Sequence, residues 1–332
     1  MDGTRKAGTM GPERGPAASR VYGPVASRRL GRSLGVDLVP FKVCPFNCVY
    51  CQLGPTTRLS AKRAEFYPVK EILAEVLARV ESSRPDYITL AGSGEPTLYE
   101  GLGSLVEGLT SATTIPVALL TNGALFQNPE VRRAAARCDV VIPSLDAGEE
   151  EFFQWVNRPV EGLTLEGITE GLALFREGYR GFIWLEVMIL QSLTEQRHHL
   201  RAIAERAKRI RPDKIQLNTP IRPSSHDFVF PVGLDRLEEL CAYFEPRAEV
   251  IAQPPKSEMR SPVPRDVADS ILEILWRRPC TLEDICAALG TSASGTLKTL
   301  ESLADEGQVR GQLRSDRYFY HALRGGPEVG SP

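Results

Sequence analysis

The chain has 332 residues, which is enough for one large domain and a second, smaller one. Its net charge of −2 argues against a general electrostatic attraction to nucleic acid. No apolar run approaches the length that spans a membrane, and the N-terminal residues lack the apolar core of a secretory signal. Seven cysteines, an odd number, suit a reducing compartment better than a disulfide framework, so we expect a cytoplasmic protein.

Both ends of the chain have the composition of disordered segments. Residues 1–20 and 325–332 are rich in glycine, proline and polar side chains and poor in large apolar ones. We therefore predict two disordered tails, with the folded part between them.

Between the tails, short runs of apolar and β-branched residues alternate with amphipathic stretches of helical period. The predicted strands are 35–39, 87–90, 117–120, 140–142, 183–188 and 214–217. The predicted helices between them are 69–81, 102–111, 128–136, 163–177 and 196–210. This alternation indicates a parallel sheet with helices outside, and six strands are too few for a closed eight-stranded barrel. We therefore expect an α/β fold, a partial (β/α)6 barrel, over residues 21–230.

The alternation stops near residue 230. Residues 231–262 are predicted to form a helix and then a linker that contains Pro254, Pro255 and Pro262. Helical patterns at 265–277, 282–289 and 294–306 precede an expected hairpin at 309–321. This order is typical of a small winged helix-turn-helix domain, expected over residues 263–324. Its third helix carries Glu301 and Asp305, which repel phosphate, so we do not expect a sequence-specific DNA reader.

Polar and glycine-rich segments directly follow the predicted strands. The second strand is followed by Gly92, Ser93, Gly94 and Glu95, the third by Thr121 and Asn122, and the fourth by Ser144 and Asp146. In α/β barrels the ligand-binding groups gather at the carboxyl ends of the strands, so this placement predicts a binding site. The alternative is local, because Ser and Asp after a strand also cap helices and a Gly/Pro segment also makes a simple turn.

Cys44, Cys48 and Cys51 are the strongest chemical signal in the chain. They have the spacing C-x3-C-x2-C, and Tyr50 stands directly before the last of them. Three close thiolates can hold three irons of a [4Fe–4S] cluster and leave the fourth iron open to a small chelating molecule. Zinc usually needs a second pair of ligands, and the sequence has no second C-x2-C or H-x3-H pair. A disulfide pair suits short secreted chains, so the sequence predicts a cluster.

These motifs resemble those of the radical S-adenosylmethionine (SAM) superfamily. The resemblance implies that the three cysteines bind a [4Fe–4S] cluster, that SAM chelates its open iron, and that Tyr50 packs near the adenine. It implies that the backbone of Gly92, Ser93, Gly94 and Glu95 receives the SAM amino group, and that the carboxylate or ribose contacts Thr121, Asn122, Ser144 and Asp146. The family motif often has Gly-Gly-Glu where this chain has Ser-Gly-Glu.

The resemblance also implies a reaction. SAM is cleaved reductively into methionine and a 5′-deoxyadenosyl radical, which abstracts hydrogen from a substrate. The implied partner is an electron donor such as flavodoxin or ferredoxin, and no membrane partner is expected. The sequence does not identify the substrate, which is an RNA, a protein or a small molecule.

Residues 21–225 resemble a narrower group, the iron–sulfur oxidoreductases related to tRNA wyosine synthase. Segments 22–39, 144–147, 157–159 and 217–220 carry this resemblance. Archaeal wyosine synthases have additional N-terminal cysteines, whereas this chain has none before Cys44. Three alternatives stay open: a wyosine-synthase-like tRNA-modifying enzyme, a glycyl-radical activase, and a redox-sensing winged-helix regulator that binds DNA.

Several residues admit two interpretations. Arg28 and Arg29 either grip a phosphate or carboxylate or form surface salt bridges. Glu186, inside the fifth strand, either meets a lumen cation or substrate or is a paired structural carboxylate. Lys42, Lys62 and Lys214 are candidates, by position alone, for the lysine that wyosine synthases use with pyruvate, and each is otherwise expected at the surface. The remaining cysteines, outside the three-cysteine loop, are expected to be small buried side chains.

Overall fold

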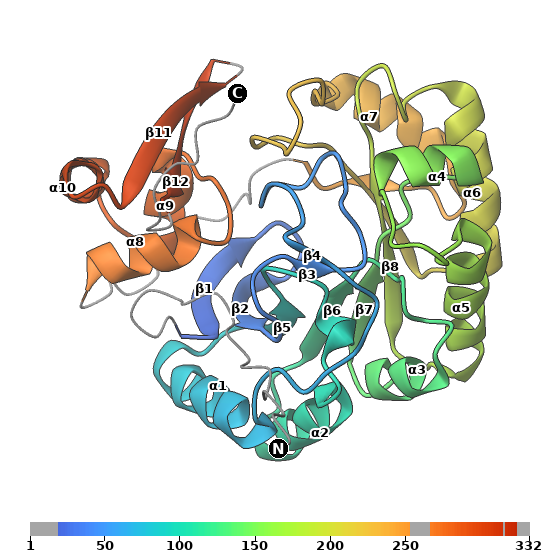
Figure 1. Ribbon diagram of the computed structural model, residues 1–332, viewed down its shortest axis with the longest axis horizontal. Helices are drawn as coiled ribbons and strands as arrows, with labels where there is room; N and C mark the ends of the chain where they lie inside the picture. Colours follow the sequence, from blue (N-terminus) through green and yellow to red (C-terminus); the bar gives the residue numbers. More distant parts are fainter. Residues whose placement is uncertain (1–18, 253–265, 315, 324–332) are drawn as a thin grey trace, which may run out of the picture.

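The computed structural model describes residues 19–252, 266–314 and 316–323. The predicted tail at 325–332, nearly all of the tail at 1–20, and the linker prolines Pro254, Pro255 and Pro262 lie outside the described residues. The described residues form an α/β barrel with a smaller group of helices and a hairpin beside it (Figure 1).

The barrel is a sheet of eight strands in the order β1-β2-β5-β6-β7-β8-β9-β10. The strands are β1 (Val21–Ser27), β2 (Gly31–Asp37), β5 (Tyr87–Ala91), β6 (Val117–Thr121), β7 (Val140–Pro143), β8 (Phe182–Met188), β9 (Lys214–Asn218) and β10 (Glu249–Val250). Neighbouring strands from β2 to β10 are parallel, and β1 is antiparallel to β2. The central strands β2 and β5 to β9 confirm the predicted partial (β/α)6 barrel.

The sequence does not predict the two edge strands. β1 contains Pro24, and its pairing with β2 shifts register between Tyr22 and Val25. Proline cannot donate a ladder hydrogen bond, so it is confined to edge strands and bulges and interrupts the strand pattern. β10 is two residues long, which is too short for a periodicity to be recognised.

Helices pack on the outside of the barrel and connect its strands (Figure 1). The predicted helices correspond to α1 (Val69–Ser83), α2 (Leu102–Ala112), α3 (Pro129–Ala135), α5 (Leu165–Gly178) and α6 (Arg197–Ile210). α4 (Glu150–Val156) is an additional short helix after β7. α3 begins as its sequence predicts, because the Asn128 side chain accepts a hydrogen bond from Glu130 N and proline occupies the first turn.

Side chains alternate across each strand, which separates an outer core from the lumen. Leu119 and Val141 belong to the main core beneath the helices. Ala118 and Val140, one residue earlier on the same strands, form a separate apolar cluster with Leu30 of the β1–β2 turn. The lumen therefore has an apolar layer of its own, next to the polar side chains described below.

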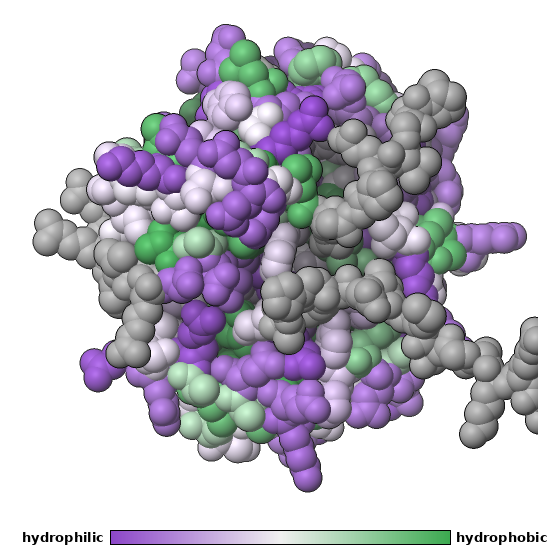
Figure 2. Space-filling model, turned by 60° about the vertical axis from the view of Figure 1, so that its left-hand side comes forward, coloured by the Kyte–Doolittle hydropathy of each residue, from purple (hydrophilic) through white to green (hydrophobic). Residues whose placement is uncertain are grey.

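The C-terminal part has its own apolar core. It consists of α8 (Val267–Leu275), α9 (Leu282–Leu289), α10 (Ala293–Asp305) and a hairpin of β11 (Val309–Arg314) and β12 (Arg317–Ala322), and α7 (Leu234–Leu240) precedes it. Ile271, Ile274 and Leu300 are buried together, and Val25 of β1 packs against them. The face that carries these elements is mainly hydrophilic (Figure 2). The element order is the expected one, and the winged-helix assignment with its bounds remains a prediction.

None of the described helices is both long enough and apolar enough to cross a membrane.

Side chains of the β1–β2 turn link β2 to the far strands of the open barrel. Arg29 forms an ion pair with Glu186 of β8, and both side chains are nearly buried. Asn218 Nδ2 of β9 donates to Glu186 Oε1 at 2.9 Å. Burial alone raises the pKa of Glu186, but the Arg29 charge and the Asn218 hydrogen bond outweigh it, so the pKa lies below its ordinary value. Glu186 is therefore a paired carboxylate, as one of the two interpretations expected.

Replacing Arg29 should destabilise the folded protein. Arg29→Met leaves a buried carboxylate unpaired and should lower the free energy of unfolding by about 3–5 kcal/mol in urea at neutral pH. Arg209→Met is the matched control, because Arg209 pairs with the exposed Glu166 and its loss should cost less than about 1 kcal/mol. Equal losses in the two variants would contradict this role of Arg29.

The cost of Arg29→Met should also depend on pH. A carboxylate whose native pKa is lowered contributes stability above its unfolded pKa of about 4.3. That contribution is lost as the pH falls through the lower native pKa, so the difference between the wild type and Arg29→Met should narrow in acid. Urea titrations at neutral and acidic pH measure this narrowing, and a difference that stays constant would exclude Glu186 as its source.

Candidate functional site

The three-cysteine loop follows β2 and is held on three sides. It contains β3 (Val43–Cys44), which pairs with β4 (Arg58–Leu59). Lys42 N donates to Ser93 O at 2.7 Å, and Val49 N donates to Val156 O of α4 at 2.9 Å. Ser225, in the segment after β9, donates its hydroxyl to Val49 O at 2.8 Å. Hydrogen bonds to the turn after β5, to α4 and to the segment after β9 therefore fix the loop that carries the thiols.

Each thiol of this loop has a nitrogen donor beside it. Cys44 Sγ lies 3.5 Å from Asn122 Nδ2, and Cys48 Sγ lies 3.5 Å from Asn157 Nδ2. Lys42 Nζ lies 2.9 Å from Cys51 Sγ. Hydrogen bonds to sulfur stabilise thiolates and help to set the reduction potential of an iron–sulfur cluster.

The thiols fit a cluster better than a single zinc ion. Burial raises the pKa of Cys44 far above its ordinary value and the pKa of Cys48 to about 12, so a bound cation is needed to hold the thiolates. Among the described residues, the three sulfur atoms do not all lie within 4.8 Å of one another. Two thiolates on one tetrahedral zinc, with Zn–S bonds of about 2.3 Å, lie only about 3.8 Å apart.

The glycine-rich turn after β5 packs directly on the cysteine loop and on β2. Gly92 has φ of +127°, and a side chain there would overlap the Asp37 carboxylate. A Cβ on Gly94 would overlap the carbonyl oxygen of Val43, next to Cys44. Ser93 donates to Asp37 from its backbone N–H and from its hydroxyl, the latter at 3.0 Å. These glycines allow the close approach of two loops, which a side chain would prevent.

Glu95 organises the ends of β5 and β6. Its buried carboxylate accepts hydrogen bonds from Thr97 N at 3.0 Å, from the Thr121 hydroxyl at 2.6 Å and from Asn122 N at 2.8 Å. Burial raises its pKa despite these donors. Glu95 also caps the short 3₁₀ helix Pro96–Leu98.

Asp146 is the corresponding buried carboxylate after β7. It accepts hydrogen bonds from Asn157 Nδ2 and from Met188 N, both at 3.0 Å, and from the Tyr50 hydroxyl. Burial raises its pKa. Asp146 thus ties the aromatic residue of the cysteine loop to the ends of β7 and β8.

A cavity of about 10 Å³, which has room for one water molecule, lies beside the cysteine loop. Its wall includes Asn122, Ser144 and Asp146, together with Phe46 of the loop and Asn157 after α4. Three of the predicted site residues therefore meet there. Other predicted site residues lie in the supporting contacts described above: Tyr50, Gly92, Ser93, Gly94, Glu95 and Thr121.

Two residues of this site have roles that the sequence did not predict. Lys42 is only 3% exposed and contacts Cys51, so the expectation of a surface lysine is wrong. Asn157 contacts both Cys48 and Asp146. Asn157 lies in a segment that resembles the wyosine-related group, and this resemblance was the signal in the sequence that could have indicated its role at the site.

The C-terminal part contacts the same site through Arg277. Arg277 Nε donates to Asp37 Oδ2 at 3.0 Å, and Arg277 Nη2 donates to Ser19 O at 2.9 Å. Its guanidinium also lies over the Tyr22 ring, 4.1 Å from the centroid. Asp37 is therefore shared between the glycine-rich turn and the residue that follows α8 by two positions.

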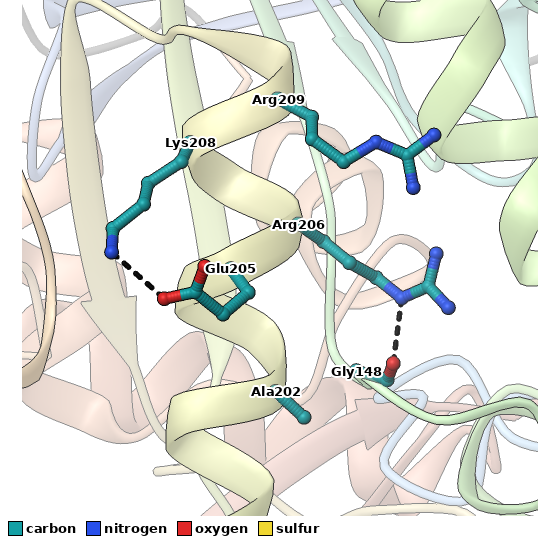
Figure 3. Close-up of a pocket in the computed structure, with 6 residues that line it drawn as sticks. All are labelled: Gly148, Ala202, Glu205, Arg206, Lys208 and Arg209. Atoms are coloured by element: carbon teal, nitrogen blue, oxygen red, sulfur yellow. Dashed lines mark hydrogen bonds and ion pairs between the residues drawn. The ribbon is translucent and has the colours of Figure 1, made fainter.

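A hollow on the outer face of α6 is a weaker candidate (Figure 3). Its charges are already paired, because Lys208 Nζ lies 2.7 Å from Glu205 Oε1 and Arg206 and Arg209 both pair with Glu166. Arg206 Nε also donates to Gly148 O at 2.6 Å. Nothing in this hollow is left to bind a ligand specifically.

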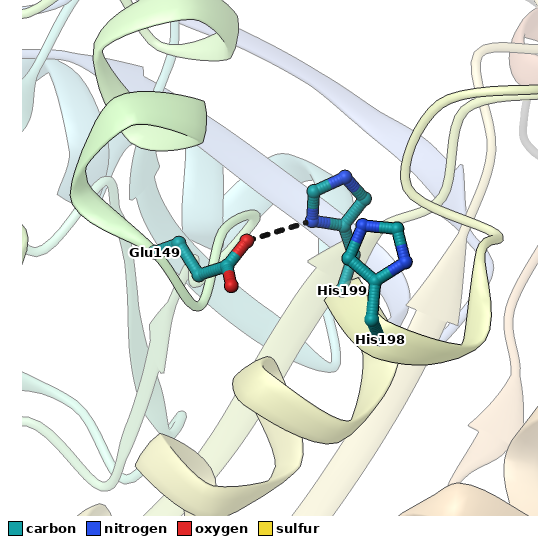
Figure 4. A group of neighbouring side chains, drawn as sticks. All are labelled: Glu149, His198 and His199. Atoms are coloured by element: carbon teal, nitrogen blue, oxygen red, sulfur yellow. Dashed lines mark ion pairs between the residues drawn. The ribbon is translucent and has the colours of Figure 1, made fainter.

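A second group of metal-ligand side chains lies at the start of α6 (Figure 4). Ligand atoms of Glu149, His198 and His199 lie within 4.8 Å of one another, and His199 Nδ1 is 3.3 Å from Glu149 Oε2. Glu149 and His198 are exposed, so water already solvates this group. This exposure contrasts with the half-buried cysteines of the cysteine loop.

Comparison with known proteins agrees with this geometry. Residues 38–207, from the end of β2 into α6, match the family model described as Radical SAM superfamily. The chain belongs to this superfamily and is therefore a radical SAM enzyme, a class that uses a [4Fe–4S] cluster and SAM.

Individual relatives have less specific descriptions. The chain is 31% identical over 308 residues to a UPF0026 protein of Helicobacter pylori, covering 91% of this chain and 97% of that protein. It is 35% identical over 297 residues to a protein of Brachyspira hyodysenteriae named GTPase Obg, of which it spans 44% of the length. A solved structure of TYW1 with a lysine-pyruvate adduct is 18% identical, covers 65% of this chain and 74% of that one, and has a TM-score of 0.49.

The packing of Gly94 predicts a coupled defect. Gly94→Ala places a methyl group against the Val43 carbonyl, so it should displace Cys44 and reduce both the iron bound after reconstitution and the affinity for SAM. Gly178→Ala is the control, because no atom lies within 4 Å of its added Cβ, and it should leave both unchanged. Iron analysis and calorimetry measure the two effects. Full iron content with weaker SAM binding alone would show that Gly94 serves only the ligand.

Proposed function

We propose that this protein cleaves SAM reductively beside the cysteine loop, at the carboxyl ends of the barrel strands, and uses the resulting radical on a substrate in the barrel lumen. The observation that carries this proposal is the position of the thiols. The three thiols on one loop each have a nitrogen donor, and the loop borders a cavity lined by Asn122, Ser144 and Asp146.

Cys44, Cys48 and Cys51 would hold the [4Fe–4S] cluster, which supplies the electron that breaks a carbon–sulfur bond of bound SAM. The positive charge of Lys42 beside Cys51 makes the neighbourhood less repulsive to an added electron. Asn122 and Asn157 each contact a thiol and also line the cavity, so they would lie next to the cluster when it is bound.

The proposed SAM contacts follow the polar strand ends. Backbone groups of Gly92, Ser93, Gly94 and Glu95 would receive the amino group, and Tyr50, Thr121, Asn122, Ser144 and Asp146 would surround the rest of the molecule. Hydrogen bonds already join some of these side chains, Tyr50 with Asp146 and Thr121 with Glu95. They pre-organise the site and reduce the conformational entropy lost when SAM binds. An electron donor such as flavodoxin or ferredoxin would deliver the electron.

The lumen would keep the radical away from water. Leu30, Ala118 and Val140 form an apolar layer inside the barrel, and Arg29 with Glu186 links β8 to the β1–β2 turn. Exclusion of water prevents quenching of a reactive intermediate. Among the described residues, no contact favours a wyosine-type, glycyl-radical or DNA-regulatory role over this general one.

The cysteine loop gives a direct test. Anaerobically reconstituted wild type should bind about four irons and release 5′-deoxyadenosine from SAM with a reductant. Cys44→Ala, Cys48→Ala and Cys51→Ala should each lose the cluster and cleave no SAM. Cys286→Ser is the control, because Cys286 lies in α9, away from the loop, and should retain both iron and cleavage. SAM cleavage at the wild-type rate in any of the three loop variants would refute the proposal.

A further inference from the structure

Two imidazoles and one carboxylate meet where α4 packs beside the start of α6. Glu149 lies directly before α4, and His198 and His199 lie in the first turn of α6. One ligand atom from each residue lies within 4.8 Å of the other two, and His199 Nδ1 is 3.3 Å from Glu149 Oε2. Figure 4 shows the carboxylate pointing toward His199, with the ring of His198 beside it. Segments far apart in the sequence thus bring these groups around one place.

The spacing of these atoms fits a zinc ion. Zinc bonds to imidazole nitrogen and carboxylate oxygen are about 2.0–2.1 Å long, which places two ligand atoms of a tetrahedral site about 3.4 Å apart. His199 Nδ1 and Glu149 Oε2 already have this spacing. His198 is exposed, so its side chain can turn and bring a ring nitrogen into the same range. The three residues can therefore supply three of the four zinc ligands, and water can supply the fourth.

His199 is held in place, and one of its ring nitrogens lacks a partner. The ring stacks on Phe152 of α4, with centroids 4.1 Å apart and an angle of 24° between the planes. Nδ1 is buried and makes no hydrogen bond with the described residues, so its contact with Glu149 does not satisfy it. Buried polar atoms are normally paired. A cation between Nδ1 and the carboxylate would satisfy both groups.

The Glu149 carboxylate is available for such a cation. Within the described part of the chain it forms no ion pair with an arginine or a lysine, and its side chain is 55% exposed. In the hollow on the outer face of α6, by contrast, two arginines already occupy Glu166. Imidazole with carboxylate suits zinc and related transition metals, whereas Mg²⁺ prefers oxygen ligands alone.

We propose that Glu149, His198 and His199 bind a zinc ion that joins the start of α4 to the start of α6. The ligands come from two helices, so the ion binds only when these helices are packed together. An ion that binds only the folded form stabilises that form. Zn²⁺ has no redox chemistry, so this ion is structural and separate from the cluster that the cysteine loop would hold.

The helix that zinc would fix also supports the cysteine loop. Val156 O, at the end of α4, accepts a hydrogen bond from Val49 N at 2.9 Å. Asn157, the next residue, lies 3.5 Å from Cys48 Sγ through its side-chain nitrogen. Zinc at the first turn of α4 would therefore restrain the helix whose last turn contacts the thiol loop.

The binding test uses reconstituted full-length protein and Zn²⁺ alone as the probe, measured by anaerobic calorimetry. The wild type should have a Zn²⁺ site that Mg²⁺ does not occupy. His198→Ala and Glu149→Gln should each weaken Zn²⁺ binding at least about tenfold, since loss of an outer-shell partner alone costs about 10–100-fold. His321→Ala is the control and should leave the affinity unchanged, because His321 lies in β12, outside the group.

Equal Zn²⁺ affinity in the wild type, His198→Ala and Glu149→Gln would overturn the site, and this comparison also identifies zinc bound only at the cysteines. A loss in His321→Ala as large as in His198→Ala would overturn the assignment to this group, and displacement of Zn²⁺ by Mg²⁺ would overturn the nitrogen ligands.

Hydrogen exchange tests the link between the helices. Zn²⁺ should slow amide exchange in α4 of the wild type and not in Glu149→Gln. Exchange in α4 that does not respond to Zn²⁺ in the wild type would overturn the link. SAM cleavage is not used as a readout, so a failure of the proposed function leaves this test intact.

Discussion

The Asp37 carboxylate holds together the parts of this protein that carry its chemistry. It lies at the end of β2, directly before the cysteine loop, and it is 3% exposed. It accepts hydrogen bonds from Ser93 N, from the Ser93 hydroxyl at 3.0 Å and from Arg277 Nε at 3.0 Å. A buried carboxylate is stable only when such donors surround it, so each of the three segments needs the others in place. Gly92 is required for the same reason, because any side chain there would occupy the position of the carboxylate.

The open barrel brings a second constraint. Parallel strands buried on both faces need a filled lumen, yet an enzyme that acts on a separate substrate needs a way in. The β1–β2 turn meets both needs with side chains. Arg29 and Glu186 pair across the lumen, and Leu30 completes its apolar layer. Because side chains rather than strands close the lumen, the edge strands β1 and β10 stay unpaired with each other. Additional strands between them would close the barrel permanently.

The sequence predicts what depends on local pattern. Buried parallel strands appear as apolar runs, so β5 to β9 were predicted to within one residue, whereas β2 begins four residues before its predicted start. A three-cysteine loop is recognisable from spacing alone. Contacts between distant segments leave no such pattern. Lysine is a residue type that is usually exposed. Lys42 is buried only because the glycine-rich turn and Cys51 enclose it. Arg277 and Asp37 are 240 residues apart in the sequence, and no local pattern near either residue predicts their pairing. The edge strand β1 was missed because Pro24 interrupts its pattern.

Arg277 connects the C-terminal helices to the site, because it donates to Asp37 and through it contacts the glycine-rich turn. Arg277 lies two positions after α8, whose Ile271 and Ile274 are buried in the C-terminal core. A displacement of α8 would therefore move a support of the proposed SAM site. The C-terminal helices thus have a physical reason to remain attached to the barrel that does not require DNA.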